Sequence, residues 1–150
     1  LPFTLLNHIA EITINTETSK HDIQANATIL VVEDNPVNQQ VVIHMLKKLD
    51  LNYDIAENGR VALAMLSTSN VWDLVLMDCQ MPVMDGFEAT TRWREQELLL
   101  GQKRIPIIAL TANAMQGDEE RCVAAGMDAH LAKPIHLASL TAMLATWLPS

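Results

Sequence analysis

From Thr28 onward, short apolar runs alternate with longer stretches in which apolar residues recur at helical spacing. The short runs cover residues 29–32, 53–56, 74–77, 107–110 and 129–132. Each is four residues long and bounded by polar residues or proline, which is typical of strands, and the stretches between them are long enough for helices. The alternation predicts an α/β fold in which each of five parallel strands is followed by a helix.

Two of the expected helices carry clear apolar stripes. Their members are Val37, Val41, Met45 and Leu49 in the first helix, and Leu137, Leu140, Leu144 and Leu148 in the last. A spacing of three or four residues predicts that each stripe faces the core. Asn35 and Pro36 supply an N-cap and a first-turn proline for the first helix.

The texture of the strands predicts their order in the sheet. The runs ILVV, LVLM and IIAL are continuously apolar, as expected of strands that are covered on both faces, whereas NYDIAE and AHLA mix polar and apolar residues like edge strands. The flavodoxin-like order 2-1-3-4-5, a doubly wound (βα)5 sheet, satisfies this with right-handed crossovers.

Residues 1–27 differ from the rest of the chain. Their second half is polar and without periodicity, which predicts a linker or the end of a preceding domain, whereas residues 28–150 form one domain. The first twelve residues carry leucines and isoleucines at helical spacing, which also fits a short docking helix. Because the chain starts without methionine, we expect it to be a fragment of a longer protein.

Composition restricts the partners of the domain. The formal net charge is −8 and the pI is about 4.9, which argues against direct binding to nucleic acid or to an anionic membrane surface. Two cysteines suggest neither a disulfide framework nor a metal cluster and favour a reducing compartment, so we expect a cytoplasmic domain. An inner-membrane anchor elsewhere in the parent protein stays open.

Complementary side chains follow four of the five strands. Glu33 and Asp34 follow the first strand, Asp78 the third, Thr111 the fourth and Lys133 the fifth. Parallel strands end at one edge of the sheet, and neighbouring strands lie ~4.8 Å apart. We therefore expect Asp34 and Asp78 to come within reach of one ion, with Glu33 close by.

This set of side chains suits phosphoryl transfer. Clustered carboxylates repel one another unless a cation lies among them, and oxygen ligands of this kind suit Mg²⁺. Asp78 is the expected nucleophile because it lies on the central strand, and Thr111 and Lys133 would contact the phosphoryl oxygens. Taken singly, each residue has an ordinary explanation: Lys133 as a surface charge, Thr111 as a helix cap, and Glu33 and Asp34 as acids at a helix start. The four strand ends taken together favour the chemical explanation.

Four stretches of the chain together resemble the receiver domain of response regulators, particularly those attached to hybrid sensor histidine kinases. They read ILVVEDNPVNQQ, DLVLMDCQMPVMDGFEA, IPIIALTANAM and AAGMDAHLAKPI. The resemblance implies that Asp78 is the phosphoacceptor and that the backbone carbonyl of Gln80 joins Glu33, Asp34 and Asp78 around Mg²⁺. It also implies a cis peptide bond before Pro134.

The same resemblance implies how the domain works. A phosphohistidine on a kinase domain would donate the phosphoryl group, and a histidine phosphotransfer protein would be the relay partner. Phosphorylation would draw Thr111 inward and alter the face formed by the helix after residues 107–110, the strand 129–132 and the final helix. His130 stands where the family often has an aromatic switch residue. A weak homodimer through the last two helices stays open.

Three other classes of protein share parts of this pattern. A Mg²⁺-dependent aspartyl-phosphate hydrolase shares much of the site but has a second aspartate two residues after the nucleophile, where this chain has Gln80. A degenerate receiver used only for docking would not need the complete acidic set. A nucleotide-binding Rossmann module is rejected because the glycines form neither GxGxxG nor a P-loop.

The charges of the segment RWREQELLLGQKRIP are expected to form a solvated face.

Overall fold

The computed structural model of the protein describes residues 18–112 and 117–150. Five parallel strands form one sheet in the order β2-β1-β3-β4-β5, as predicted. The strands are β1 (Thr28–Val32), β2 (Asn52–Ala56), β3 (Leu74–Asp78), β4 (Ile107–Thr111) and β5 (Ala129–Ala132). The three central strands are almost completely buried, whereas β2 and β5 lie at the edges and are partly exposed.

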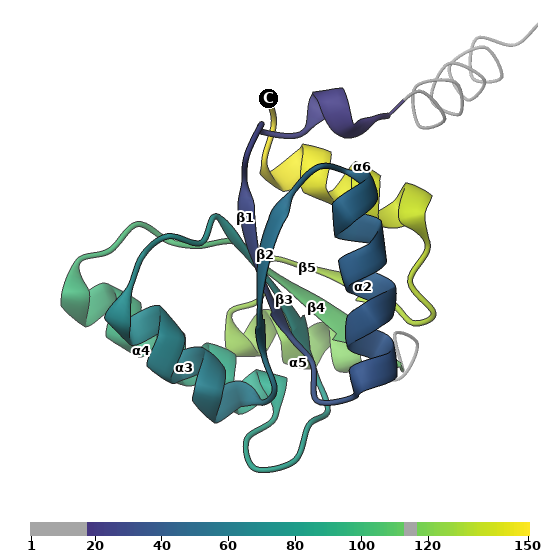
Figure 1. Cartoon of the computed structure of the whole chain (residues 1–150). Helices are drawn as coiled ribbons and strands as arrows, with labels where there is room; N and C mark the ends of the chain where they lie inside the picture. Colours follow the sequence, from purple (N-terminus) through teal and green to yellow (C-terminus); the bar gives the residue numbers. More distant parts are fainter. Residues whose placement is uncertain (1–17, 113–116) are drawn as a thin grey trace, which may run out of the picture.

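Helices cover both faces of this sheet (Figure 1). They are the 3₁₀ helix η1 (Lys20–Asp22) and the α-helices α2 (Pro36–Lys48), α3 (Gly59–Thr68), α4 (Gly86–Leu100), α5 (Asp118–Ala125) and α6 (Leu137–Trp147). α2 and α6 pack on one face, and α3, α4 and α5 on the other. No helix in residues 18–112 or 117–150 is long and apolar enough to cross a membrane.

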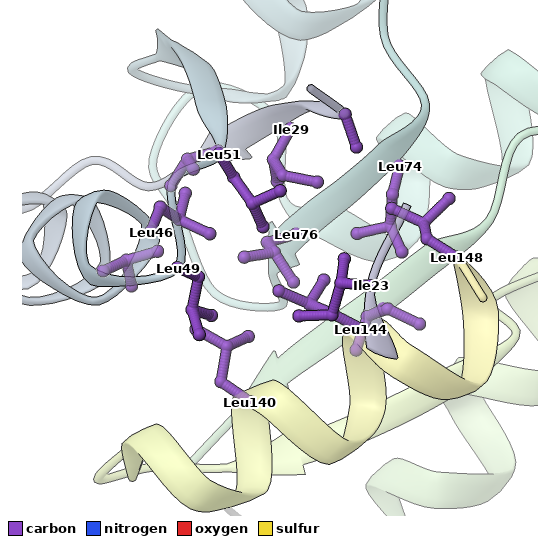
Figure 2. Close-up of a cluster of buried hydrophobic side chains, with 14 of the residues drawn as sticks. Ile23, Ile29, Leu46, Leu49, Leu51, Leu74, Leu76, Leu140, Leu144 and Leu148 are labelled. Carbon is purple, nitrogen blue, oxygen red and sulfur yellow. The ribbon is translucent and has the colours of Figure 1, made fainter. Parts of the chain in front are cut away.

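The core on the α2–α6 face consists of aliphatic side chains from the sheet and the two helices (Figure 2). Leu140, Leu144 and Leu148 are buried there, which confirms most of the predicted stripe of the last helix, although Leu137 is 36% exposed. Burying a leucine side chain stabilises a fold by about 1.5–3 kcal/mol, so this layer accounts for much of the driving force that holds α6 to the sheet.

The predicted core stripe of the first helix is wrong in its first half. Val37 is 71% exposed and Val41 is 43% exposed, whereas the core contacts of α2 come from Val42 and Leu46. A four-residue spacing drifts around a helix of 3.6 residues per turn, so a stripe that ends at the buried Leu49 begins on the solvent side. The predicted cap is confirmed, since Asn35 accepts hydrogen bonds from the first turn of α2.

Packing begins before the expected domain boundary at Thr28. Ile23 and Ala27 are buried in the α2–α6 core, and Ile23 forms an antiparallel bridge with Pro149. The backbone of Gln24 also donates a hydrogen bond to the carbonyl of Leu148. The short segment from Ser19 to Ala27 is therefore part of the folded unit. The docking helix considered for the first twelve residues lies outside the described residues.

The charged segment of α4 and the loop after it is not simply a solvated face, contrary to the prediction. Arg94 and Glu97 are nearly buried and form an ion pair at 3.0 Å, and Arg94 also contacts Asp128 at 2.9 Å. The Glu97 carboxylate accepts hydrogen bonds from Trp93 Nε1 and from the backbone of Ile105. These contacts lie at the amino ends of β4 and β5, opposite the edge where the acidic residues gather.

Candidate functional site

The carboxylates expected at the carboxyl edge of the sheet lie together. Glu33 and Asp34 directly follow β1, and Asp78 is the last residue of β3. One carboxylate oxygen from each lies within 4.8 Å of the other two. Glu33 and Asp78 are buried and Asp34 is exposed, so the cluster opens to solvent on one side. The adjacency of β1 and β3 in the sheet brings these segments together.

The first turn of α2 holds Glu33 in place. Glu33 Oε1 accepts hydrogen bonds from the backbone of Asn35 at 3.2 Å and from the Asn38 amide at 3.3 Å, and the Gln39 amide donates to the Glu33 carbonyl at 2.7 Å. Sequence reasoning missed Asn38 and Gln39. The signal was their position in the first turn of a helix that starts beside the acid pair, where side chains reach back toward the strand end.

Lys133 supplies a cation to this cluster. Its ammonium lies 3.1 Å from Asp78 Oδ1 and 3.2 Å from Glu33 Oε2. Partial burial by itself lowers the pKa of an ammonium, but hydrogen bonds and charges from Asp78 and Glu33 outweigh it and raise the pKa of Lys133. The peptide bond between Lys133 and Pro134 is cis, as the family resemblance implies.

The loop after β3 borders the site. The backbone of Gln80 donates a hydrogen bond to Asp78 Oδ1 at 3.3 Å. The neighbouring Cys79 is buried, and burial raises the pKa of its thiol, which therefore stays protonated and is no rival nucleophile. Gly86 packs so closely that an added Cβ would collide with the backbone carbonyl of Asp78. Glycine is therefore required here for the close approach of two backbone segments and not for chemistry.

Thr111 and His130 contact the first turn of α5. Thr111, at the end of β4, is buried, and its hydroxyl donates a hydrogen bond to Asp118 Oδ2 at 3.1 Å. His130 Nε2 lies 3.1 Å from Glu119 Oε1. The two residues expected to take part in a switch therefore both contact the same helix turn. Sequence reasoning did not single out Asp118 or Glu119.

Comparison with known proteins assigns the fold to a family. The model of the response regulator receiver domain matches residues 29–145. The chain belongs to this receiver domain family. The receiver is 43% identical over 118 residues to the hybrid signal transduction histidine kinase A of Dictyostelium discoideum. That alignment covers 79% of this chain and 6% of the relative, so the chain spans only a small part of that relative's length.

Solved structures agree with this assignment. The receiver domain of a Pseudomonas aeruginosa sensor histidine kinase, with magnesium coordinated in its active site cleft, is 44% identical with a TM-score of 0.72, over 82% of this chain and 98% of that one. The receiver domain of Ssk1 from Saccharomyces cerevisiae, crystallised with the histidine phosphotransfer protein Ypd1, is 31% identical with a TM-score of 0.78, over 83% and 90%.

The donor set of this receiver fits a hard divalent cation. A polar depression of about 180 Å³ is lined by Glu33, Asp34, Asp78 and Gln80, among others, and Lys133 borders it. Three carboxylates with the exposed side open to water suit Mg²⁺, which prefers oxygen ligands and keeps several waters. The single ammonium of Lys133 leaves the cluster with more negative than positive charge, and a cation would offset that excess.

Proposed function

We propose that the domain is the phosphoacceptor of a phosphorelay and belongs to a hybrid sensor histidine kinase. In this relay, Asp78 receives a phosphoryl group from a phosphohistidine of a partner. The observation that carries this proposal is the carboxylate of Asp78, buried at the carboxyl edge of the sheet with the Lys133 ammonium at 3.1 Å. A nucleophile held beside a fixed cation is suited to a reaction that develops negative charge on phosphoryl oxygens.

The transfer itself needs little from the protein beyond positioning. A carboxylate oxygen of Asp78 attacks phosphorus, the bond between phosphorus and the histidine nitrogen breaks, and the imidazole leaves with that electron pair. Lys133 already contacts Asp78 and offsets the charge of the phosphoryl oxygens. Mg²⁺, held by Glu33, Asp34, Asp78 and the backbone carbonyl of Gln80, would supply further positive charge when bound. Later attack by water on the phosphorus of the acyl phosphate releases inorganic phosphate and returns Asp78 to its carboxylate.

The output is a shift between two conformations. The phosphoryl group attracts the Thr111 hydroxyl, which lies on the strand next to β3. Movement of Thr111 would alter α5, because the two are hydrogen bonded, and so bias the face formed by α5, β5 and α6. His130 lies on β5 within this face and contacts Glu119, so it is placed to report the change.

The exposed apolar side of α2 supports a helical phosphotransfer protein as partner. Val37 and Val41, with Pro36 and Met45, line an apolar depression on this helix. α2 begins two residues after Asp34, so a partner seated here would present a histidine at the acidic cluster. Exposed apolar surface of this kind commonly marks a protein interface. The relation to the receiver crystallised with Ypd1 agrees with this choice of partner.

Treatment with a small phosphodonor and Mg²⁺ tests the acceptor role against a hydrolase. Intact-mass analysis should show one phosphoryl group per chain, and free phosphate should appear slowly after the donor is removed. Sustained release of phosphate over many turnovers would support an aspartyl-phosphate hydrolase instead. The absence of both products would support a degenerate receiver.

Substitution on α2 tests the docking surface separately. Val37→Asp should slow transfer from a phosphorylated histidine phosphotransfer protein at least tenfold, roughly the cost of burying one charge in an apolar contact. Transfer from the small phosphodonor should not change. Val71→Asp is the matched control, because Val71 is also exposed but precedes β3 at the opposite edge. Equal effects of the two variants would exclude α2 as the docking site.

A further inference from the structure

Asp118 contacts Thr111 although it lies outside the acidic cluster. The Thr111 hydroxyl donates a hydrogen bond to Asp118 Oδ2 at 3.1 Å, and both side chains are buried. Acidic residues are favourable in the first turn of any helix, and Glu119 and Glu120 stand there too. Those two are exposed, however, whereas Asp118 is 6% exposed and points to Thr111. The helix dipole explains an acid at this position but not its direction.

The chemistry of this hydrogen bond sets up a competition. A threonine hydroxyl has one proton to donate, and ionised carboxylate and phosphoryl oxygens only accept. Donation from Thr111 to Asp118 and donation to a phosphoryl group on Asp78 therefore exclude each other. While Thr111 is hydrogen bonded to Asp118, its hydroxyl cannot stabilise the phosphorylated state.

Arg121 offsets the charge of the buried Asp118 carboxylate when the hydrogen bond from Thr111 is lost. Asp118 Oδ1 lies 3.8 Å from the Arg121 guanidinium, one turn along α5. Arg121 in turn stacks 4.1 Å above the ring of Phe87 on α4, which favours this orientation of its guanidinium. When Thr111 turns away, Asp118 keeps Arg121 as a partner, so the carboxylate is not left as an uncompensated buried charge.

We propose that Asp118 is a positioning residue that competes with the aspartyl phosphate for the Thr111 hydroxyl and thereby sets how readily the receiver enters its phosphorylated conformation. This inference rests on the proposed function. It predicts that loss of the Asp118 carboxylate favours the phosphorylated conformation, whereas loss of a residue that merely assists phosphorylation would disfavour it.

Binding of beryllofluoride, a phosphoryl mimic, tests the inference in the presence of Mg²⁺. Asp118→Ala should bind it about tenfold more tightly than wild type, the order expected when a hydrogen bond to a charged group no longer competes. The apparent affinity can be followed by NMR at the backbone amide of Thr111. Asp118→Asn should shift affinity in the same direction, and it keeps the shape of the side chain if the alanine variant does not fold.

Two controls separate competition from a general effect of charge or structure. Glu120→Ala removes the same charge from the same helix turn, at an exposed position, and should change affinity less than about twofold. In a Thr111→Ala background, Asp118→Ala should have no effect, because the hydroxyl under competition is gone. Unchanged or weaker binding by the Asp118 variants, or an equal gain in the Thr111→Ala background, would overturn the inference.

The same experiment distinguishes failure of this inference from failure of the proposed function. If wild-type protein binds no beryllofluoride and accepts no phosphoryl group, the acceptor role itself is wrong. If wild type binds it and the Asp118 variants bind equally well, the acceptor role stands and only the role of Asp118 is lost.

Discussion

Two clusters of charged side chains lie at opposite ends of the strands, one at the carboxyl ends and one at the amino ends, and their charge balance differs. The carboxyl-edge cluster consists of Glu33, Asp34, Asp78 and Lys133; the amino-edge cluster consists of Arg94, Glu97, Arg104 and Asp128. The amino-edge cluster pairs two cations with two anions. The carboxyl-edge cluster sets three carboxylates against one ammonium and therefore carries an excess of negative charge.

The difference separates a structural network from a reactive one. At the amino edge, the Arg94 guanidinium contacts two carboxylates and also donates to the carbonyls of Ile105 and Gly126. Its hydrogen-bonding capacity is used within the protein. At the carboxyl edge, Asp34 is exposed and the carboxylates outnumber their cation, so the cluster can still take up a metal ion or react.

Removal of Arg94 should have the largest effect on stability. Arg94→Ala leaves the buried carboxylate of Glu97 without its cation and should lower the free energy of unfolding by about 3–5 kcal/mol. Urea denaturation measures this directly. Arg104→Ala is the control: Arg104 contacts the same Asp128 but is 57% exposed, and its loss should cost less than about 1 kcal/mol. Similar losses in the two variants would contradict the assignment of a buried structural network.

A methyl group at Gly86 should come next. Gly86→Ala forces the helix start away from the Asp78 carbonyl and should destabilise the protein by about 1–3 kcal/mol, the usual cost of overpacking. It should also weaken Mg²⁺ binding, measured by calorimetric titration, because the displaced backbone carries the acidic cluster. Gly101→Ala is a control for Mg²⁺ binding: the left-handed backbone of Gly101 (φ 65°) should make alanine cost about 1–2 kcal/mol there too, but this residue ends α4 far from the acidic cluster, so the Mg²⁺ affinity should not change. Unaltered Mg²⁺ affinity in Gly86→Ala would show that the close approach does not position the site.

Neutralising Asp78 should have a smaller effect of opposite sign. Asp78→Asn relieves repulsion among the carboxylates and should raise the free energy of unfolding without metal by about 1 kcal/mol, because Lys133 already offsets part of that repulsion. Mg²⁺ should stabilise wild type more than the variant. Thermal melts with chelator and with Mg²⁺ measure both effects. A variant less stable than wild type in chelator would show that the ion pair with Lys133 outweighs the repulsion.

The smallest expected effect is a pH dependence that comes from Lys133. Because its pKa is raised above the ordinary 10.5, its contribution to stability should be fully present below pH 10.5 and lost as the pH rises through the raised value. The difference in unfolding free energy between wild type and Lys133→Met should therefore be constant around neutral pH and shrink only in strong alkali. A difference that shrinks between about pH 7 and 9 would contradict the raised pKa.

Much of the fold could be predicted because strand texture and helix spacing follow from local physics. The continuously apolar runs form the three central strands, and the mixed polar and apolar runs at residues 52–56 and 129–132 form the edge strands. The register of α2 could not be read from spacing alone, because Val37 and Val42 are equally apolar and only the packed structure decides which one faces the sheet. An apolar side chain left in solvent has no local signature.

The candidate site was predictable where residues directly follow strands and less so elsewhere. Glu33, Asp34 and Asp78 are brought together by topology alone, since parallel strands end at one edge. Asp118 and Asn38 lie within helices, and their roles depend on how those helices dock, which the sequence does not display. The burial of Arg94 and Glu97 could not be predicted for the same reason, because a charged helix segment is expected to be solvated unless its tertiary partners are known.

The location of the phosphoryl group tests the central claim most directly. Protein treated with a phosphodonor and Mg²⁺, then reduced with borohydride to trap the acyl phosphate, can be mapped peptide by peptide. The reduced residue should be Asp78 alone, and Asp78→Asn should give no product. Trapping at Asp34 or at several carboxylates, or product in Asp78→Asn, would contradict the assignment of Asp78 as the acceptor.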